Sequence, residues 1–325
     1  MLTQAMPGLH RTELDCTVLM ILDLEWEMAK RIVKVIDLVP GRSVQLPSID
    51  NETLRHGQFW SDHVCAQKPV VIRGAVRNWP ALRKWNAPGY LEALTDSEVG
   101  ISDAFNASPT GLWYANLPKL KLNQAITRLR DAGPDETHAI RALPIPSEWK
   151  PDLGHYEFLE REHDRPPRAY AQDRLFIYRN ASTEWHYHTT DETLTTQIIG
   201  TKRISMFRLS SENWQAYAVP IKSNLHHMND GARFFPADGA LTKFETTLAP
   251  GDVLYIPPFW WHGVDPADND FGITLAHCFR TPLNRLGSLS DPAVKDVIRA
   301  QQSAMLAFRM RAFVALGSLS RLVTS

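Results

Sequence analysis

The chain of 325 residues is poor in cysteine, with only Cys16, Cys65 and Cys278 and no Cys-x-x-Cys pair. A disulfide framework is therefore excluded, and a reducing compartment is expected. Excess charge is lacking too: 35 basic and 36 acidic residues give a net charge of -1, which argues against broad electrostatic binding to nucleic acid. No apolar run is long enough to span a bilayer, and the first residues lack the pattern of a signal peptide. These absences predict a cytoplasmic protein that contacts no membrane.

What is present is an ordinary globular composition, with 44% hydrophobic and 22% charged residues. Apolar residues at three- and four-residue intervals predict helices over residues 16–38, over 51–65 and beyond Pro292. Between them, short β-rich runs separated by turn residues are typical of a sandwich or barrel. The expected fold is mainly β with flanking helices. Its strands are predicted at residues 70–72, 174–178, 194–199, 203–207, 243–248, 252–256 and 272–278.

Twelve histidines stand out, and His186 and His188 lie one residue apart at the end of the strand expected from Arg174. Side chains at i and i+2 of a strand project from one face, so the two imidazoles could bind one metal ion together. Acidic residues follow at Asp191 and Glu192. If the strand continued without a break, Glu192 would share the face of the two histidines and Asp191 would point away.

A second motif lies downstream, where a Pro-Gly-Asp turn at residues 250–252 feeds an apolar strand. Pro257 and Pro258 end that strand, and two tryptophans precede His262. This pattern predicts a hairpin that delivers an imidazole into an apolar barrel mouth. We expect Trp185, Trp260 and Trp261 to wall the site.

With both motifs in this order, the chain resembles the cupin-like JmjC group of Fe(II)- and 2-oxoglutarate-dependent oxygenases, particularly the branch of the asparaginyl hydroxylase that inhibits hypoxia-inducible factor. The resemblance implies a double-stranded β-helix, the jelly-roll or cupin barrel. It covers about residues 45–282 and is carried by residues 68–75, Trp79-Pro80, 183–186, 197–203 and 251–262.

The resemblance also implies roles for individual residues. His186 matches the first metal ligand of the family and His262 the distal one. Lys202 matches the lysine that pairs with the remote carboxylate of 2-oxoglutarate, and Thr183 matches a hydroxyl that hydrogen-bonds the same group. Further candidates around the cosubstrate are Tyr114 and His277.

The chain departs from the family at the second ligand, because the family has an acid where this chain has His188. It also carries one extra residue between His186 and Gln197. Three interpretations stay open. His188 ligates directly, a bulge brings in Asp191 or Glu192, or the site is degenerate. A neutral imidazole in place of a carboxylate would leave the metal centre one unit more positive.

The expected function is a hydroxylase that uses Fe(II), 2-oxoglutarate and O₂ on a protein side chain or a small molecule. The alternatives are a 2-oxoglutarate-independent cupin enzyme with three histidines and Glu192, and a non-catalytic cupin-like binding module. We expect a helical extension at 1–45, the oxygenase domain at 46–284 and a helical region at 285–325 that forms a homodimer. His226 and His227 are expected in solvent, in a polar loop.

Overall fold

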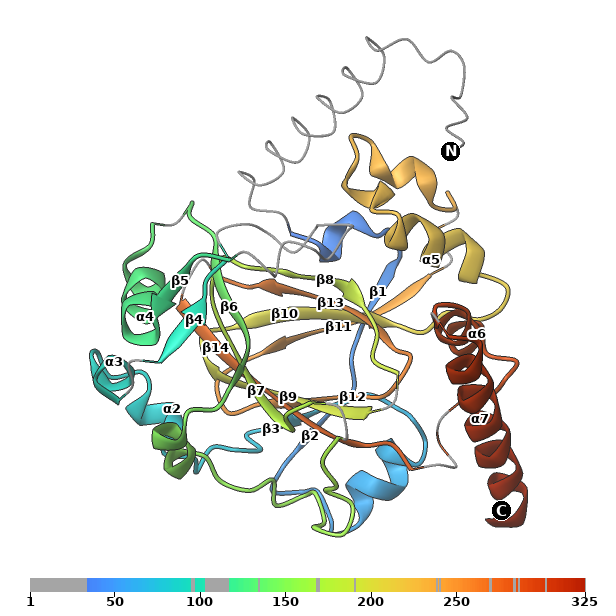
Figure 1. Cartoon of the computed structure of the whole chain (residues 1–325), viewed down its shortest axis with the longest axis horizontal. Helices are drawn as coiled ribbons and strands as arrows, with labels where there is room; N and C mark the ends of the chain where they lie inside the picture. The colour runs from blue at the N-terminus through green and yellow to red at the C-terminus, as the bar shows by residue number, and fades with distance from the viewer. Residues whose placement is uncertain are drawn as a thin grey trace, which may run out of the picture.

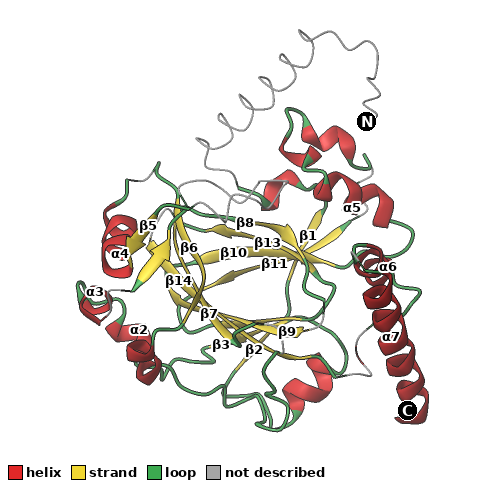
Figure 2. Cartoon of the chain, in the orientation of Figure 1, coloured by secondary structure: helices red, strands yellow, loops and turns green. Residues whose placement is uncertain are grey.

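The computed structural model contains two facing β-sheets with helices around them (Figures 1 and 2). It describes residues 34–94, 97–102, 117–133, 135–167, 170–189, 191–237, 239, 241–268, 271–282, 285, 287–301 and 303–324. Tyr114 and most of the helix predicted over 16–38 lie outside the described residues.

The larger sheet has seven strands in the order β2-β3-β12-β9-β14-β7-β6. Its strands alternate between a face that points into the barrel and a face that packs on the outer helices. On β14, for example, Ile273 and Leu275 belong to the outer apolar core, whereas Thr274 points into the barrel and donates a hydrogen bond to Gln197. The strands are β2 (Ser48–Asp50), β3 (Val70–Arg73), β6 (His138–Pro144), β7 (Asp173–Arg179), β9 (Asp191–Ile199), β12 (Val253–Ile256) and β14 (Phe271–Arg280).

The smaller sheet has five strands in the order β1-β11-β10-β13-β8, so β8 is an edge strand. In Figure 1 it lies above the larger sheet, and the two sheets enclose the barrel interior. Its inner face carries Ile204 and Met206 of β10 and Val264 of β13. The strands are β1 (Arg42–Gln45), β8 (Thr183–His186), β10 (Lys202–Phe207), β11 (Thr242–Leu248) and β13 (Trp261–Pro266). Part of the expected N-terminal extension, Arg42–Gln45, thus joins the sheet.

Helices cover the outer faces of both sheets. The larger sheet packs on α2 (Ala81–Lys84), α3 (Tyr90–Leu94) and α4 (Leu122–Asp131), beside the small sheet of β4 (Glu98–Gly100) and β5 (Lys119–Lys121). The smaller sheet packs on η1 (Ile36–Leu38), α5 (Trp214–Lys222) and the segment that ends in η6 (Gly231–Phe234). The remaining short helices are η2 (Phe59–Val64), η4 (Ser147–Asp152) and η5 (Leu225–His227).

At the C-terminal end, α6 (Pro292–Arg299) and α7 (Ala304–Thr324) lie against one end of the barrel (Figure 1). Asp291 caps α6 by accepting the backbone N–H of Ala293. Phe259, which follows β12, packs with Val294 and Val314 of these two helices. No helix in the described ranges is both long enough and apolar enough to cross a membrane.

The predicted barrel of short strands with flanking helices is confirmed, and all seven predicted strands are present. Three expectations are wrong in detail. The strand from Arg174 does not reach His186, because it ends at Arg179 and a left-handed Asn180 (φ 50°) turns the chain before β8. The helix predicted over 51–65 is reduced to Phe59–Val64. The C-terminal helix is interrupted between Arg299 and Ala304.

Candidate metal centre

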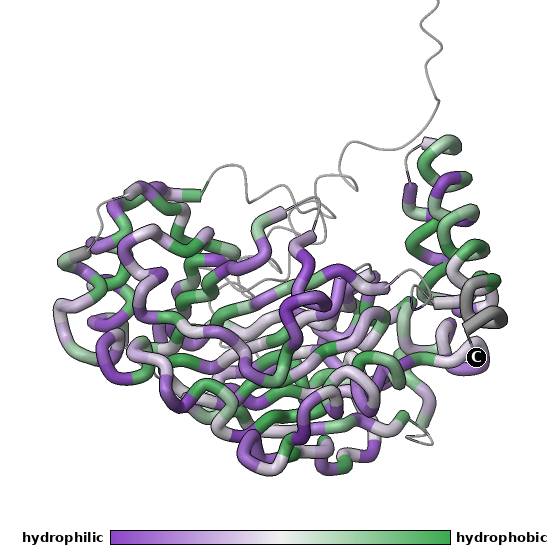
Figure 3. Tube along the Cα trace, turned by 90° about the horizontal axis from the view of Figure 1, so that it is seen from below, coloured by the Kyte–Doolittle hydropathy of each residue, from purple (hydrophilic) through white to green (hydrophobic). Residues whose placement is uncertain are grey.

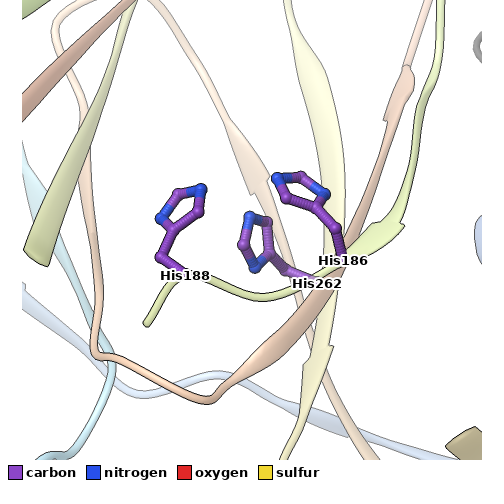
Figure 4. A group of neighbouring side chains, drawn as sticks. All are labelled: His186, His188 and His262. Atoms are coloured by element: carbon purple, nitrogen blue, oxygen red, sulfur yellow. The ribbon is translucent and has the colours of Figure 1, made fainter. Parts of the chain in front are cut away.

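Three imidazoles converge inside the barrel mouth (Figure 4). His186 ends β8, His188 lies in the loop after it, and His262 is on β13, directly opposite His186 in the antiparallel register. The candidate ligand atoms all lie within 4.8 Å of one another. The ring centroids of His186 and His262 are 4.1 Å apart, and that of His188 is 5.2 and 4.9 Å from them. The structure thus brings together the three histidines that the sequence singled out.

The hydrogen bonds of the three rings leave one nitrogen of each ring for a metal. Nδ1 of His186 donates to the carbonyl of Glu184 at 2.8 Å, and Nδ1 of His262 donates to that of Trp260 at 3.0 Å. A carbonyl can only accept, so Nδ1 carries the proton and Nε2 of a neutral ring has a free lone pair. Nδ1 of His188 lies 2.7 Å from Oγ1 of Thr193. Such outer partners orient metal-binding imidazoles.

The three rings are neutral at physiological pH. Burial lowers the pKa of His186, and burial together with the neighbouring rings holds the pKa of His262 well below its usual value. Burial, reinforced by the charges of His186 and Arg174, lowers the pKa of His188 to about 3. Neutral imidazole is the form that binds a metal, so the three rings are in a state that could ligate a divalent ion.

The acids considered as second ligands turn elsewhere. Glu192 is fully buried on the outer side of β9, where Oη of Tyr255 donates to it at 2.7 Å. Burial raises the pKa of Glu192 to about 8. Asp191 accepts a hydrogen bond from Oη of Tyr170 at 2.5 Å. Among the described residues, the group of potential metal ligands that contains His186 includes neither Asp191 nor Glu192.

Glu192 points away from the histidines because the alternation of inward and outward side chains is not continuous from β8 to β9. The sequence argument put Glu192 on the face of His186 for a continuous strand, but residues 187–190 lie between β8 and β9. β9 begins at Asp191, and in this strand the side chain of Thr193 points into the barrel, where it contacts His188. Glu192 then faces outward.

Lys202 and Thr183 line the same cavity as His186. This cavity of about 470 Å³ lies between the two sheets, and Arg141, Arg174 and Tyr178 also line it. Lys202 is buried, and its Nζ stands 3.9 Å from the centroid of the Tyr178 ring. Burial lowers the pKa of Lys202 to about 7. Among the described residues no carboxylate pairs with it, so the ammonium form of Lys202 is buried without a counter-ion.

His277 does not join this site. It lies on the outer face of β14, where it contacts Asp173 of β7 at 2.7 Å and Asp164 at 2.9 Å. Burial alone would lower the pKa of His277, but the two carboxylates raise it to about 9. Its neighbour Cys278 faces inward, 3.6 Å from Thr193. His277 is therefore a buried cation between two acids, on the far side of the sheet from the triad.

The tryptophans are also placed differently from the expected wall. Trp185 and Trp261 pack on the outer face of the smaller sheet, with Phe207 and Tyr217. Only Trp260 contacts the cluster inside the barrel. The strand alternation that turns His186 and His262 inward turns Trp185 and Trp261 outward.

The loop that carries His188 is anchored to neighbours outside the barrel. The backbone carbonyl of His188 accepts a hydrogen bond from the N–H of Phe259 at 2.8 Å, and Phe259 has a left-handed φ of 64°. Next to it, Oη of Tyr187 donates to Asp296 of α6 at 2.8 Å. These contacts fix the position of His188 after the end of β8.

The sequence missed a second cluster at the mouth of the barrel. His226 and His227, expected in solvent, have side chains that are 0% and 4% exposed. Both rings bond to Glu184, two residues before His186. Burial would raise the pKa of Glu184, but the two histidines outweigh it and lower it to about 2. The only signal in the sequence was the pair of adjacent histidines.

Comparison with known proteins agrees with this fold. Residues 56–284 match the Cupin-like domain family. The chain is 39% identical over 259 residues to Bifunctional peptidase and (3S)-lysyl hydroxylase JMJD7 of Homo sapiens, covering 63% of this chain and 76% of that protein. It is 23% identical over 240 residues to Lysine-specific demethylase JMJ30 of Arabidopsis thaliana (71% of this chain, 54% of that protein).

A third relative, tRNA wybutosine-synthesizing protein 5 of Homo sapiens, is 23% identical over 248 residues, covering 72% of this chain and 77% of that protein. The chain spans about half the length of the Arabidopsis demethylase. It belongs to the cupin-like JmjC family, and the structure shows a barrel of the expected kind.

Proposed function

We propose that the protein is an oxygenase that depends on Fe(II), 2-oxoglutarate and O₂, with His186, His188 and His262 as its metal ligands. One observation supports this most directly: the buried ammonium of Lys202, without a carboxylate partner among the described residues, lines the same cavity as His186. A dicarboxylate that reaches the metal with one end would place its other carboxylate near this cation. Opposite charges attract strongly where water is scarce.

The donor set fits a divalent transition metal. Three neutral imidazole nitrogens suit iron, copper, nickel or zinc, and an ion held on one side by three ligands keeps positions open for cosubstrate and oxygen. When bound, iron and 2-oxoglutarate supply the activation of O₂ that inserts an oxygen atom into a C–H bond. Lys202 and Thr183 orient the cosubstrate, and the barrel wall excludes water from it.

The substrate proposed is a protein side chain or a small molecule. The human relative is named a lysyl hydroxylase and the plant relative a lysine demethylase, which favours a side chain of a protein as the first class to test. The near-neutral net charge of -1 gives less reason to test RNA first.

The test is an anaerobic titration with Fe(II), with and without 2-oxoglutarate, followed by oxygen-dependent release of succinate. Lys202→Met should abolish binding of 2-oxoglutarate and leave metal binding intact. Lys243→Met is the matched control, because Lys243 is equally buried in the same sheet but donates to the carbonyls of Ile36 and Val39. Metal-loaded protein that binds no 2-oxoglutarate would contradict the proposal.

A second candidate function rests on the ligand set itself. A three-histidine centre is one charge more positive than one with a carboxylate, which favours cupin chemistry without 2-oxoglutarate, such as a dioxygenase or isomerase. Metal binding that is indifferent to both 2-oxoglutarate and Lys202→Met would support it. Failure to bind any divalent metal would leave a cupin-like binding module.

A further inference from the structure

We propose that Glu184, His226 and His227 form a second divalent-metal site, of the zinc type, at the mouth of the barrel. The inference does not depend on the proposed function, because it uses none of the residues that would hold iron or 2-oxoglutarate. The three residues offer ligand atoms that all lie within 4.8 Å of one another. Two histidines and one carboxylate are the ligand set of many zinc sites.

The geometry matches a shared ion. Nε2 of His226 lies 2.9 Å from one carboxylate oxygen of Glu184, and Nε2 of His227 lies 2.5 Å from the other. In a tetrahedral site, ligand atoms about 2.1 Å from zinc lie about 3.4 Å apart, so the two nitrogen–oxygen pairs would have to open by about 0.5 and 0.9 Å to admit an ion. Each carboxylate oxygen of Glu184 faces one imidazole.

The rings of His226 and His227 lie closer together than the regular geometry of their 3₁₀ helix would place them. Adjacent residues of a 3₁₀ helix point about a third of a turn apart, yet the rings of His226 and His227 lie 4.2 Å apart and meet one carboxylate. Left-handed residues at Asn224 and Asp230 bracket this segment. Gly231 packs so closely that a Cβ there would stand 2.5 Å from the carbonyl oxygen of His226. The backbone is therefore shaped to hold both rings in place.

The position of the site gives the ion a structural role. Glu184 is on β8, the edge strand of the smaller sheet, and the two histidines belong to the segment after α5. The carbonyl of Glu184 also accepts the Nδ1 proton of His186. An ion bound here would tie the covering segment to the edge strand and hold the residue that orients the first histidine of the triad.

The experiment counts metal ions on the full chain. After removal of metal with a chelator, the wild type is titrated with Zn²⁺, and with Co²⁺ for its visible absorption, and should bind two equivalents. Glu184→Gln and His227→Gln should each lose one equivalent and keep the one that His188→Ala removes. Glu245→Gln is the matched control, since Glu245 is as exposed as Glu184, at 16%, in the same sheet.

Circular dichroism checks that each variant is folded, and His227→Gln tests the site even where Glu184→Gln fails to fold. The proposal is overturned by a wild type that binds a single equivalent, lost in His188→Ala and retained in His227→Gln. It is equally overturned by two equivalents that neither Glu184→Gln nor His227→Gln reduces. In both cases the contacts among the three side chains would be ordinary hydrogen bonds.

Discussion

Thr193 is the residue through which the unusual second histidine of the triad is oriented. Its Oγ1 lies 2.7 Å from Nδ1 of His188. If His188 binds a metal through Nε2, the hydroxyl would accept the proton of Nδ1. Thr193→Val removes this acceptor at nearly constant volume, so we expect the affinity for Fe(II) or Zn²⁺ to fall about 10- to 100-fold. Thr193→Ser should retain it. Isothermal titration of both variants decides, and an unchanged dissociation constant in Thr193→Val would exclude His188 as an Nε2 ligand.

On the proposed function, Lys202 would make the binding of 2-oxoglutarate depend on pH. Its pKa is about 7 in the absence of a ligand, because burial disfavours the ammonium form. Binding of an anion requires that form. Below pH 7 the ammonium is already present, and above pH 7 a proton must be taken up with the ligand. We therefore expect the dissociation constant to rise about tenfold for each pH unit above 7.

This dependence is measured by oxygen-free titration calorimetry of the metal-loaded protein between pH 6.5 and 9. Two buffers of different ionisation enthalpy report the uptake of the proton directly. A dissociation constant that is flat over this range, without proton uptake, would show that Lys202 does not receive the carboxylate.

At the scale of elements, His277 joins β14 to β7 and to the segment before it, through Asp173 and Asp164. Its pKa is raised from 6.5 to about 9. The stabilisation is therefore complete below pH 6.5 and is lost as the pH rises through 9. Since both acids are partly exposed, we expect a loss of about 2 kcal/mol. Urea unfolding across this range should show the slope in the wild type and not in His277→Gln; parallel profiles would contradict it.

The same elements show what the sequence could and could not predict. The seven predicted strands were predictable because β-branched runs between turn residues report burial directly, whereas strands without such runs, among them β6 and β13, were not predicted. The orientation of the Glu192 side chain was not, because β8 ends at His186 and β9 begins only at Asp191, so the alternation of faces is not continuous. The contacts of His226 were not either, since they depend on packing against Gly231 and on a carboxylate 42 residues earlier.

At the scale of the whole molecule, the exposed apolar surface of α7 is the feature that a partner protein would cover. Met305, Phe308, Leu316 and Leu319 recur at helical intervals and are 56–70% exposed, and Figure 3 shows hydrophobic colour along this helix at the flank of the molecule. Among the residues of α7 whose side chains are described, Val314 is fully buried in the apolar cluster around Phe259, and Ala307 and Met310 pack partly buried against it. We propose that a second copy of the chain covers this surface, as a homodimer.

Light scattering at increasing protein concentration tests the dimer. The wild type should have twice the mass of one chain, and Phe308→Glu with Leu316→Glu should have the mass of one chain. Arg309→Glu, on the same helix, should leave the mass unchanged. A wild type that stays monomeric at high concentration would contradict the homodimer.

One residue links this flank of the molecule to the metal centre. The ring of Phe259 lies among side chains of α6 and α7, while its N–H holds the carbonyl of His188. Tyr187, beside His188, is bonded to α6 as well. The backbone at His188 is thus held by contacts with residues that pack on the two C-terminal helices. On the proposed function, we expect a partner that displaces these helices to change the affinity of the triad for metal.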